Sequence, residues 1–363
     1  MHKEYINHKD LKRGIFRILA DAVNPYCWIM AARNKAFDAG MLESRSFGIP
    51  VICVGNISVG GTGKTPHIEY IVKLLKRQYR IAVLSRGYGR KSKGYIKAGT
   101  DTTMEALGDE PFQIKNKYPE IAVAVCEKRV EGIERLMTEE KGLQTILLDD
   151  AYQHRYVKAG LNILLIDMNR PVWCDNVMPF GRLRESIAGI KRADIVIMTK
   201  CGERAMGQHE EICNRIRSYK DIPVYFSAIR YGRLYPLFGE ARQEAAITPG
   251  SSILLVTGIA KPQLLKEEIE KRGAKVTLMQ YGDHHNFTTA EIDEIAKRFG
   301  ETGSTMIVTT EKDATRLLHR TDLPQEIRDN IYALPIEMAI LNGEEELFNQ
   351  NIYNYVTENS RDS

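Results

Sequence analysis

Short, almost continuous apolar runs recur from residue 49 onward and predict buried strands. They cover Ile49–Val54, Ile81–Leu84, Ile121–Val125, Thr145–Leu148, Ile163–Ile166 and Ile195–Met198. Helix-compatible stretches, such as Pro66–Lys76 and Lys128–Glu139, lie between several of these runs. Strands that are apolar on both faces and alternate with helices are typical of a parallel sheet covered by helices on both sides. We therefore expect residues 49–223 to form a doubly wound, mostly parallel α/β domain.

The pattern changes near Pro223. The next stretch, VYFSAIRYGRLYPL, alternates and contains Gly232, which favours a two-stranded connection over residues 224–239. A second set of elements follows, predicted at Ser252–Thr257, Pro262–Arg272, Ala274–Met279, Thr289–Phe299 and Thr305–Thr309. We assign residues 240–345 to a smaller α/β domain and residues 346–363 to a C-terminal tail, whose last residues are expected to be disordered.

The N-terminal segment, residues 1–48, carries an amphipathic pattern. Apolar residues recur at helical spacing at Leu11, Ile15, Ile18, Leu19, Ala22, Val23 and Tyr26. Lys12, Arg13 and Arg17 lie off this stripe, and Pro25 is expected to kink or stop the helix. Such a helix either lies on an anionic membrane or docks on its own domain. The pattern alone favours docking, because most amphipathic helices face their own protein.

Composition narrows the class of protein. The chain has 363 residues, a formal net charge of +4, 43% hydrophobic and 27% charged residues, which suits a globular protein of two domains. So small a net charge argues against nucleic-acid binding over the whole surface, but permits local basic patches. No apolar run approaches the roughly 18 residues of a membrane span, and the first residues lack the apolar core of a signal peptide. The six cysteines include no C-x-x-C pair, which favours a reduced compartment.

The strongest chemical signal is the stretch VICVGNISVGGTGKTPH, residues 51–67. An apolar strand runs into a glycine-rich loop and then into a helix. Such a loop turns backbone N–H groups toward a phosphate chain, and the helix N-terminus adds its positive dipole end. Lys64 can reach the β- and γ-phosphates, and the Thr65 hydroxyl can ligate Mg²⁺. Ser58 stands where the usual pattern has a glycine. The predicted phosphate loop comprises Ser58, Val59, Gly60, Gly61, Thr62, Gly63, Lys64 and Thr65.

Two acidic motifs complement this loop. In QTILLDDAYQHR an apolar strand ends in Asp149 and Asp150. A phosphate-loop protein needs a carboxylate at the tip of a neighbouring strand for Mg²⁺, and a cation also relieves the repulsion between adjacent acids. In LGDEPFQ, Asp109 and Glu110 precede Pro111. Asp109 is either a helix-capping acid or a general base near the γ-phosphate.

Other motifs carry arginine and histidine. SRGYGR, EKR and PFGRLRES place Arg86, Arg90, Arg129, Arg182 and Arg184 beside turns or strand ends. Each suits phosphate binding, although a single such arginine is more often a surface charge. GDHHNFT contains Asp283, His284 and His285 but no third ligand at helical spacing, so we expect no zinc site and consider a proton relay or an orienting pair instead.

Together these motifs identify a family resemblance. The chain resembles the tetraacyldisaccharide 4′-kinase (lipid A 4′-kinase) family of Gram-negative bacteria over most of its length. The shared motifs, in order, are VGNISVGGTGKTP, SRGYGR, GDEP, LLDDAYQHR, PFGRLRE, ADIVIMTK, DHHNFT and TTEKDA. The family commonly reads Asp-Asp-Gly-Phe-Gln-His where this chain has Ala151 and Tyr152, but both acids and His154 are retained.

The resemblance implies transfer of the ATP γ-phosphate to the 4′-hydroxyl of a tetraacylated glucosamine disaccharide 1-phosphate. It also implies two α/β/α domains, a two-stranded hinge matching residues 224–237, and an N-terminal helix that touches the membrane. The helical pattern of residues 11–30 is then interpreted as that membrane contact. The implied partners are ATP, the lipid A disaccharide precursor and the anionic inner-membrane surface at its cytoplasmic face. We expect no nucleic acid and no obligate protein partner.

The resemblance further assigns roles to single residues. Thr65 would hold Mg²⁺ with Asp149 or Asp150, and Glu185 would join them. Asp109, in the family's GDEP position, would accept the 4′-hydroxyl proton. His284, or else its neighbour His285, would tune Asp109 from the second domain. Arg129 matches a family arginine near the transferred phosphate.

Two other functions fit parts of the sequence. A GTPase-like metal chaperone shares the phosphate loop and an acidic strand end, but it gives no reason for GDEP or DHHNFT. The chain also lacks the N-K-x-D guanine motif, of which TTEKD at 309–313 is a loose echo. A non-catalytic ATP-binding membrane scaffold would need the loop but not Asp109.

Overall fold

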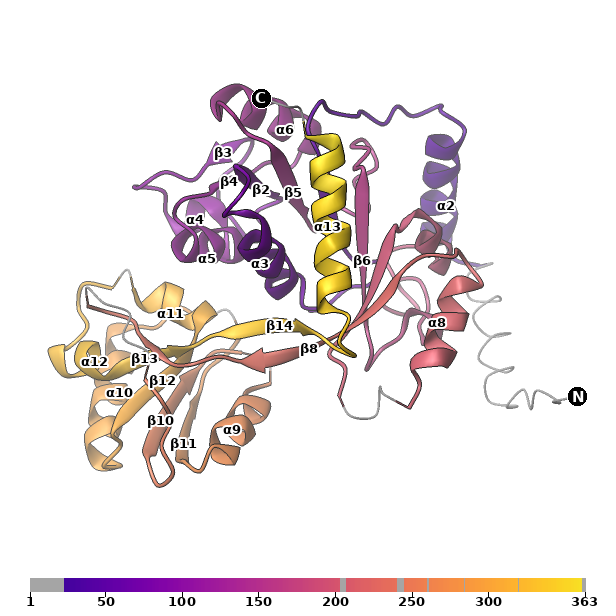
Figure 1. Cartoon of the computed structure of the whole chain (residues 1–363). Coiled ribbons are helices and arrows are strands. Elements are labelled where there is room, and N and C mark those ends of the chain that lie inside the picture. The colour runs from indigo at the N-terminus through magenta and orange to yellow at the C-terminus, as the bar shows by residue number, and fades with distance from the viewer. Residues whose placement is uncertain are drawn as a thin grey trace, which may run out of the picture. The chain divides into compact units, whose positions relative to one another are not determined.

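The computed structural model describes residues 23–202, 207–239, 245–259, 261–283, 285–318 and 320–360. The described chain forms two compact units, which are taken separately below. The larger unit lies within residues 1–229 and 338–363, and the smaller unit comprises residues 230–337. Figure 1 shows the elements of both.

The larger unit is built on a nine-stranded sheet with the order β14-β8-β7-β6-β1-β5-β2-β4-β3. The strands are β1 (Val51–Gly55), β2 (Ile81–Ser85), β3 (Ile96–Lys97), β4 (Ala122–Val125), β5 (Thr145–Asp149), β6 (Leu161–Asp167), β7 (Ile195–Thr199), β8 (Val224–Tyr231) and β14 (Ile336–Ile340). All neighbouring pairs from β4 to β8 are parallel, and β3 is antiparallel to β4. This confirms the predicted doubly wound, mostly parallel sheet.

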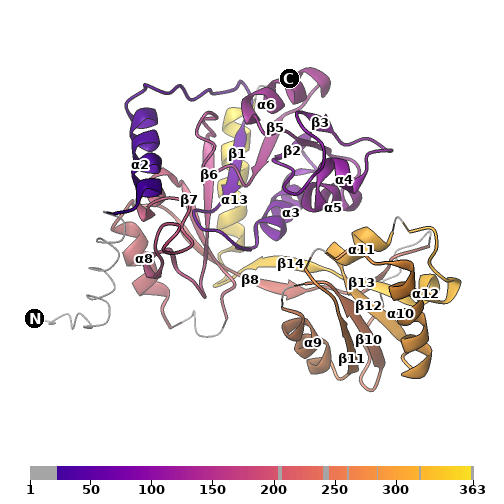
Figure 2. The same ribbon diagram turned by 180° about the vertical axis from the view of Figure 1, so that it is seen from behind.

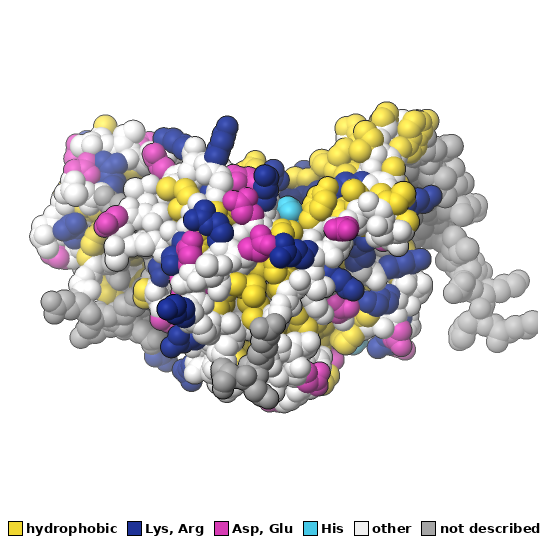
Figure 3. Space-filling view, turned by 90° about the horizontal axis from the view of Figure 1, so that it is seen from above, with side chains coloured by type: hydrophobic (Ala, Val, Ile, Leu, Met, Phe, Trp, Pro, Cys, Tyr) yellow, Lys and Arg dark blue, Asp and Glu magenta, His cyan; other side chains and the backbone are white. Residues whose placement is uncertain are grey.

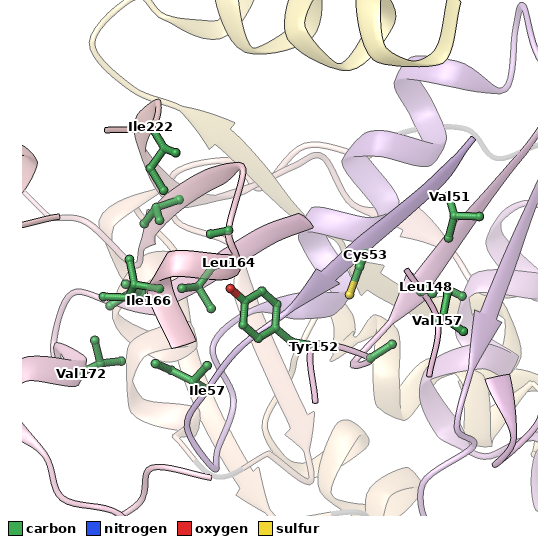
Figure 4. Close-up of a cluster of buried hydrophobic side chains, with 14 of the residues drawn as sticks. Val51, Cys53, Ile57, Leu148, Tyr152, Val157, Leu164, Ile166, Val172 and Ile222 are labelled. Carbon is green, nitrogen blue, oxygen red and sulfur yellow. The ribbon is translucent and has the colours of Figure 1, made fainter. Parts of the chain in front are cut away.

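Helices cover both faces of this sheet because its strands are apolar on both sides. Ile52 and Val54 belong to a core that also contains residues of α3 (Lys64–Leu75), α5 (Asp109–Lys117) and α13 (Glu345–Asn359). Figure 1 labels these three helices. Val51 and Cys53 belong to the opposite core, shared with α6 (Arg129–Glu139) and α8 (His209–Arg217). Figure 2 labels these two helices, and Figure 4 shows part of this core, including Val51 and Cys53. A short helix, α4 (Met104–Leu107), precedes α5.

Strand order places the phosphate loop at a switch point of the sheet. The chain leaves β1 toward β2 on one side and later reaches β6, β7 and β8 on the other. In doubly wound sheets, ligands bind outside the carboxyl ends of the strands at such a point. The edge formed by the carboxyl ends of β1, β5 and β6 is therefore where a ligand is expected.

The smaller unit is a five-stranded sheet with the order β11-β10-β12-β13-β9. Its strands are β9 (Tyr235–Pro236), β10 (Ser252–Thr257), β11 (Lys275–Gln280), β12 (Met306–Thr310) and β13 (Ile331–Leu334). Its helices are α9 (Pro262–Lys271), α10 (Thr289–Glu301), α11 (Glu311–Leu317) and α12 (Gln325–Asn330). Four strands are parallel and β9 is antiparallel, so this unit repeats the α/β design on a smaller scale.

The strands that connect the two units are not both the ones predicted from the sequence. Residues 224–239 were expected to supply both connecting strands, but β9 pairs within the smaller sheet. The neighbour of β8 is instead β14, about 100 residues later in the chain. The predicted tail is also wrong over most of its length, because α13 buries Phe348, Ile352 and Val356 in the core of the larger unit.

Helix α2 (Pro25–Asp38) begins at the proline that was expected to kink or stop the preceding helical pattern. Pro25 occupies the first turn, where a missing N–H costs nothing. Asn24 caps the helix by accepting hydrogen bonds from the Tyr26 and Cys27 amides. The amphipathic pattern of residues 11–22 lies outside the described residues. Among the described helices, none has the length and apolar character needed to cross a membrane.

Candidate active site at the phosphate loop

The loop between β1 and α3 has the backbone that its glycines predict. Gly60 and Gly63 adopt φ of 116° and 86°, a region that side chains disfavour. A side chain at Gly61 would meet no atom within 4 Å, so the loop is open on that side. Ser58, which departs from the usual pattern, forms an isolated antiparallel bridge with Leu183 and needs no positive φ. A serine therefore fits this position.

Neighbouring segments hold this loop in place. The Val59 amide donates to the Arg182 carbonyl at 2.7 Å, and the Arg184 amide donates to the Ile57 carbonyl at 2.8 Å. The buried Asn56 amide group donates to the Thr62 hydroxyl at 2.8 Å. These contacts explain why the PFGRLRE motif accompanies the phosphate loop, since its backbone braces one side of that loop.

His67 links the phosphate loop to the sheet through hydrogen bonds that involve both of its ring nitrogens. Its Nδ1 lies 2.7 Å from the Gly63 carbonyl oxygen and its Nε2 lies 3.0 Å from the Ser227 hydroxyl of β8. Burial lowers the pKa of His67 to about 4, so the ring is neutral near pH 7. A neutral imidazole can donate through Nδ1 and accept through Nε2, which matches these two partners.

The acidic pair lies beside the loop because β5 pairs with β1. Val54 is in register with Asp149, and the Asp150 amide donates to the Val54 carbonyl. The Lys64 ammonium lies 3.7 Å from Asp150 Oδ1, and the Arg184 guanidinium donates to the same oxygen at 3.0 Å. The structure therefore brings together Lys64 and Asp150, two residues predicted from motifs 86 positions apart.

Asp149 is the buried member of the acidic pair. Its side chain is 1% exposed, and burial, together with Glu110 and Asp150, raises its pKa to about 7. Its Oδ1 is buried without a hydrogen-bond partner. A buried unpartnered carboxylate oxygen is costly unless a water or cation satisfies it. Oxygen donors of this kind suit Mg²⁺, which commonly uses one or two carboxylates together with phosphates and water.

A metal centre made by side chains alone is absent from the described ranges, where no group of three His, Cys, Asp or Glu side chains could hold an ion.

Arg129 is buried directly behind the acidic pair. It is 1% exposed, donates to the Cys126 carbonyl at 2.6 Å, and reaches the Asp149 carbonyl at 3.4 Å. Burial lowers its pKa, while Asp149 and Asp150 oppose that shift. The arginine thus supplies a fixed positive charge beneath two carboxylates.

Asp109 begins α5 at the same edge of the sheet as the phosphate loop. Both α3 and α5 run opposite to the strands, and they are joined where Glu69 accepts from Gln113 and pairs with Lys117. Their first residues, Lys64 and Asp109, therefore lie toward the carboxyl edge. Gly108, at φ 89°, allows the GDEP turn to pack against SRGYGR, since a side chain there would approach the Tyr88 carbonyl to 2.9 Å.

Glu185 lies near the loop but is fully engaged by protein donors. Arg192 contacts its Oε1 at 2.6 Å, Gln153 contacts Oε1 at 2.9 Å, and Asn34 of α2 contacts Oε2 at 3.1 Å. The carboxylate is 1% exposed. These contacts tie α2 to the segment that follows Asp150, and the role of Glu185 as a magnesium ligand stays a prediction.

The structural role of these contacts can be tested by stability. Glu185→Gln is expected to lower the free energy of unfolding by about 2–3 kcal/mol, because a buried charge-assisted hydrogen bond is lost. Urea unfolding would measure it. The control is Glu105→Gln, which removes an exposed ion pair with Lys91 and should cost under about 1 kcal/mol. Equal stabilities of the two variants would contradict the structural role.

The remaining motif residues have other partners or lie elsewhere. The Arg90 side chain pairs with Glu127 at 2.5 Å, whereas Arg86 and Arg182 are exposed. In the smaller unit, His285 stacks on Tyr281 and lies 2.9 Å from Glu291, part of the helix-capping box of α10. His284, the predicted partner of Asp109, lies outside the described residues.

Comparison with known proteins decides the family. A sequence model described as "Tetraacyldisaccharide-1-P 4'-kinase" matches residues 15–357. The chain belongs to the tetraacyldisaccharide-1-P 4′-kinase family. The tetraacyldisaccharide 4′-kinase of Bacteroides thetaiotaomicron is 48% identical, over 93% of this chain and 94% of that protein. The Porphyromonas gingivalis protein of the same name is 44% identical, over 87% and 90% respectively.

A solved structure of this kinase family has the same fold. The crystal structure of LpxK from Aquifex aeolicus in complex with ATP matches with a TM-score of 0.71 and 27% identity, and covers 96% of this chain and 99% of that one. Family membership makes this chain an ATP-dependent kinase of lipid A biosynthesis.

Sequence reasoning missed several residues around the kinase site. The side chains of three residues form hydrogen bonds that join α2, the phosphate loop and the segment that follows Asp150. They are Asn34, Asn56 and Gln153. Their signal is weak because amides occur in many loops. Lys200 was more accessible to prediction, since it directly follows a strand of the parallel sheet within the motif ADIVIMTK.

Proposed function

We propose that this chain transfers the γ-phosphate of ATP to the 4′-hydroxyl of a tetraacylated glucosamine disaccharide 1-phosphate. Family membership supports the reaction. The observation that carries the site assignment is the juxtaposition of Lys64 with Asp150, beside the buried and unpartnered Asp149 oxygen. A phosphate loop next to an acidic strand end is what phosphoryl transfer requires.

The loop from Ser58 to Thr65 would hold the phosphates of ATP. Its amides and the N-terminus of α3 supply positive potential, and Lys64 offsets charge on the β- and γ-phosphates. Thr65, Asp149 and Asp150 would hold Mg²⁺. When bound, the ion would neutralise charge that develops on the transferred phosphoryl group.

Asp109 would act as the general base. It is half-buried at the start of α5, at the edge to which the phosphate loop also belongs. Its carboxylate would accept the proton of the 4′-hydroxyl as that oxygen attacks the γ-phosphorus. The family resemblance assigns the tuning of this base to His284 or to its neighbour His285. Arg129 would stabilise the acidic pair and the transferred phosphate electrostatically.

We place the reaction at the cytoplasmic face of the inner membrane, with the chain bound peripherally. Helix α2 and the residue before its cap support this location, because Trp28 and Ile29 of the helix and the preceding Val23 are exposed, with Trp28 at 57%. Figure 3 shows hydrophobic side chains gathered at this end of the larger unit. Exposed aromatic and aliphatic residues beside basic ones suit a lipid interface.

Membrane binding is expected to depend on the basic residues that precede α2. Replacing Arg13 and Arg17 by glutamate should lower binding to vesicles with anionic lipid, most clearly at low salt where screening is weak. Vesicle co-sedimentation at two salt concentrations would measure this. Equal binding of wild type and variant at low salt would assign these arginines to the protein core instead.

A phosphate-transfer assay tests the proposed function directly. Purified protein, ATP, Mg²⁺ and a tetraacyl disaccharide 1-phosphate should yield the 4′-phosphorylated product. A preference for GTP over ATP, with no product, would favour the GTPase-like alternative, which the family membership does not support.

A further inference from the structure

Lys200 contacts the phosphate loop from a strand not assigned to the site. It follows the last residue of β7 and has φ of 57°, which directs the chain away sharply after the strand. Its ammonium donates to the Gly61 carbonyl in the loop and lies 2.7 Å from Asp167 Oδ2. Asp167 is the last residue of β6. The carboxyl ends of β6 and β7 and the loop that follows β1 thus meet at this cation, and these three strands are neighbours in the sheet.

The direction of the Gly61 carbonyl has a consequence for the loop. A trans peptide is planar, so its carbonyl and the N–H of the following residue point in opposite directions. When the Gly61 oxygen faces Lys200, the Thr62 N–H points away from Lys200. A phosphate cradle depends on such N–H groups having fixed orientations, because each can donate to the ligand only from one side.

The loop itself does little to fix this peptide. Gly60 and Gly61 have no side chains, and a side chain at Gly61 would meet nothing within 4 Å. Glycine also populates many backbone conformations, so this peptide can rotate at low cost. The Thr62 hydroxyl accepts a hydrogen bond from Asn56, which restrains the Thr62 side chain. The orientation of the Gly61–Thr62 peptide itself is restrained by the contact to its carbonyl oxygen.

We propose that Lys200 is a positioning residue that fixes the Gly61–Thr62 peptide in the orientation needed to bind the phosphates of ATP. The inference rests on the proposed function only in taking ATP as the ligand of this loop. Asp167 holds the ammonium against the carbonyl and balances its charge, since the pair is only partly exposed. Lys200 thereby gives the ADIVIMTK motif a role.

The test is ATP binding by the full-length protein without lipid substrate, measured by titration calorimetry. Lys200→Met should weaken ATP binding roughly 10-fold or more, the loss expected for a charge-assisted hydrogen bond. In the kinase assay it should raise the KM for ATP by a similar factor. It should change kcat and the KM for the disaccharide less than about threefold, because the loop regains its geometry once ATP is bound.

A matched control is Lys220, whose partners lie at the amino end of β7. Its ammonium donates to the Ala193 carbonyl at 2.6 Å and lies 3.3 Å from Asp194, so it has a carbonyl and a carboxylate as partners, as Lys200 does. Lys220→Met should leave ATP binding unchanged. Lys200→Gln, which is neutral and shorter but still polar, provides a second variant if Lys200→Met folds poorly, and should weaken ATP binding similarly.

The outcomes separate cleanly. Folded Lys200 variants that bind ATP as tightly as Lys220→Met would overturn the inference, and so would variants that lose kcat at an unchanged KM for ATP. Wild-type protein that binds ATP but does not phosphorylate the disaccharide would refute the proposed function and leave the Lys200 result valid.

Discussion

Asp109→Ala is expected to lower the turnover number by at least about 100-fold, the lower range for loss of a general base. Asp109 lies at the first turn of α5, and α5 is tied to the phosphate-loop helix through Glu69. Under the proposed function, this substitution removes the carboxylate that accepts the 4′-hydroxyl proton. Because Asp109 is not part of the phosphate loop, the KM for ATP should change little. Steady-state kinetics with both substrates varied would measure this effect.

Asp101→Ala is the control for this experiment. Asp101 is an exposed acid close in sequence to α5, so its loss should leave turnover within about twofold. A non-catalytic ATP-binding scaffold would tolerate both substitutions equally. Turnover of Asp109→Ala within threefold of wild type would remove Asp109 from the catalytic residues.

Lys64→Ala is expected to lower kcat by about 100- to 1,000-fold, the range measured when one donor to a developing negative charge is removed. The Lys64 side chain is only 11% exposed and its ammonium lies 3.7 Å from Asp150. Its loss removes charge from the phosphate site and leaves Asp150 with Arg184 as its cationic partner. Single-turnover kinetics at saturating ATP would isolate this effect from ATP binding.

Two further variants sharpen the result. Lys64→Arg should not restore activity, because a planar guanidinium does not replace a compact ammonium in a site with so little room. Lys76→Ala changes a lysine at the opposite end of α3, where it pairs with Glu120. It should leave kcat within about twofold. Comparable losses in Lys64→Ala and Lys76→Ala would point to damage of the helix rather than loss of a phosphate contact.

The sequence predicted the local elements of the sheet well, because burial leaves a direct record in the chain. Strands covered on both faces are apolar through their central positions, as residues 51–54 of β1 and 146–148 of β5 are. Prediction failed where a segment's partner is distant. Helix α13 carries apolar residues at helical spacing, Phe348 and Ile352 among them, but the sequence does not show which distant surface they pack against. The second connecting strand, β14, could not be inferred from residues 224–239, since strand pairing depends on which distant segment returns.

Function shows the same division. The sequence by itself determined the phosphate loop, the acidic strand end and the family, because a phosphate cradle demands particular residues at adjacent positions. Only the tertiary structure separated Glu185, which is satisfied by three protein donors, from Asp149, whose Oδ1 is left without one. Only the tertiary structure brought Lys200 to the Gly61 carbonyl. The physical reason is that a side chain's role depends on which atoms share its space, and folding brings together atoms that are far apart along the chain.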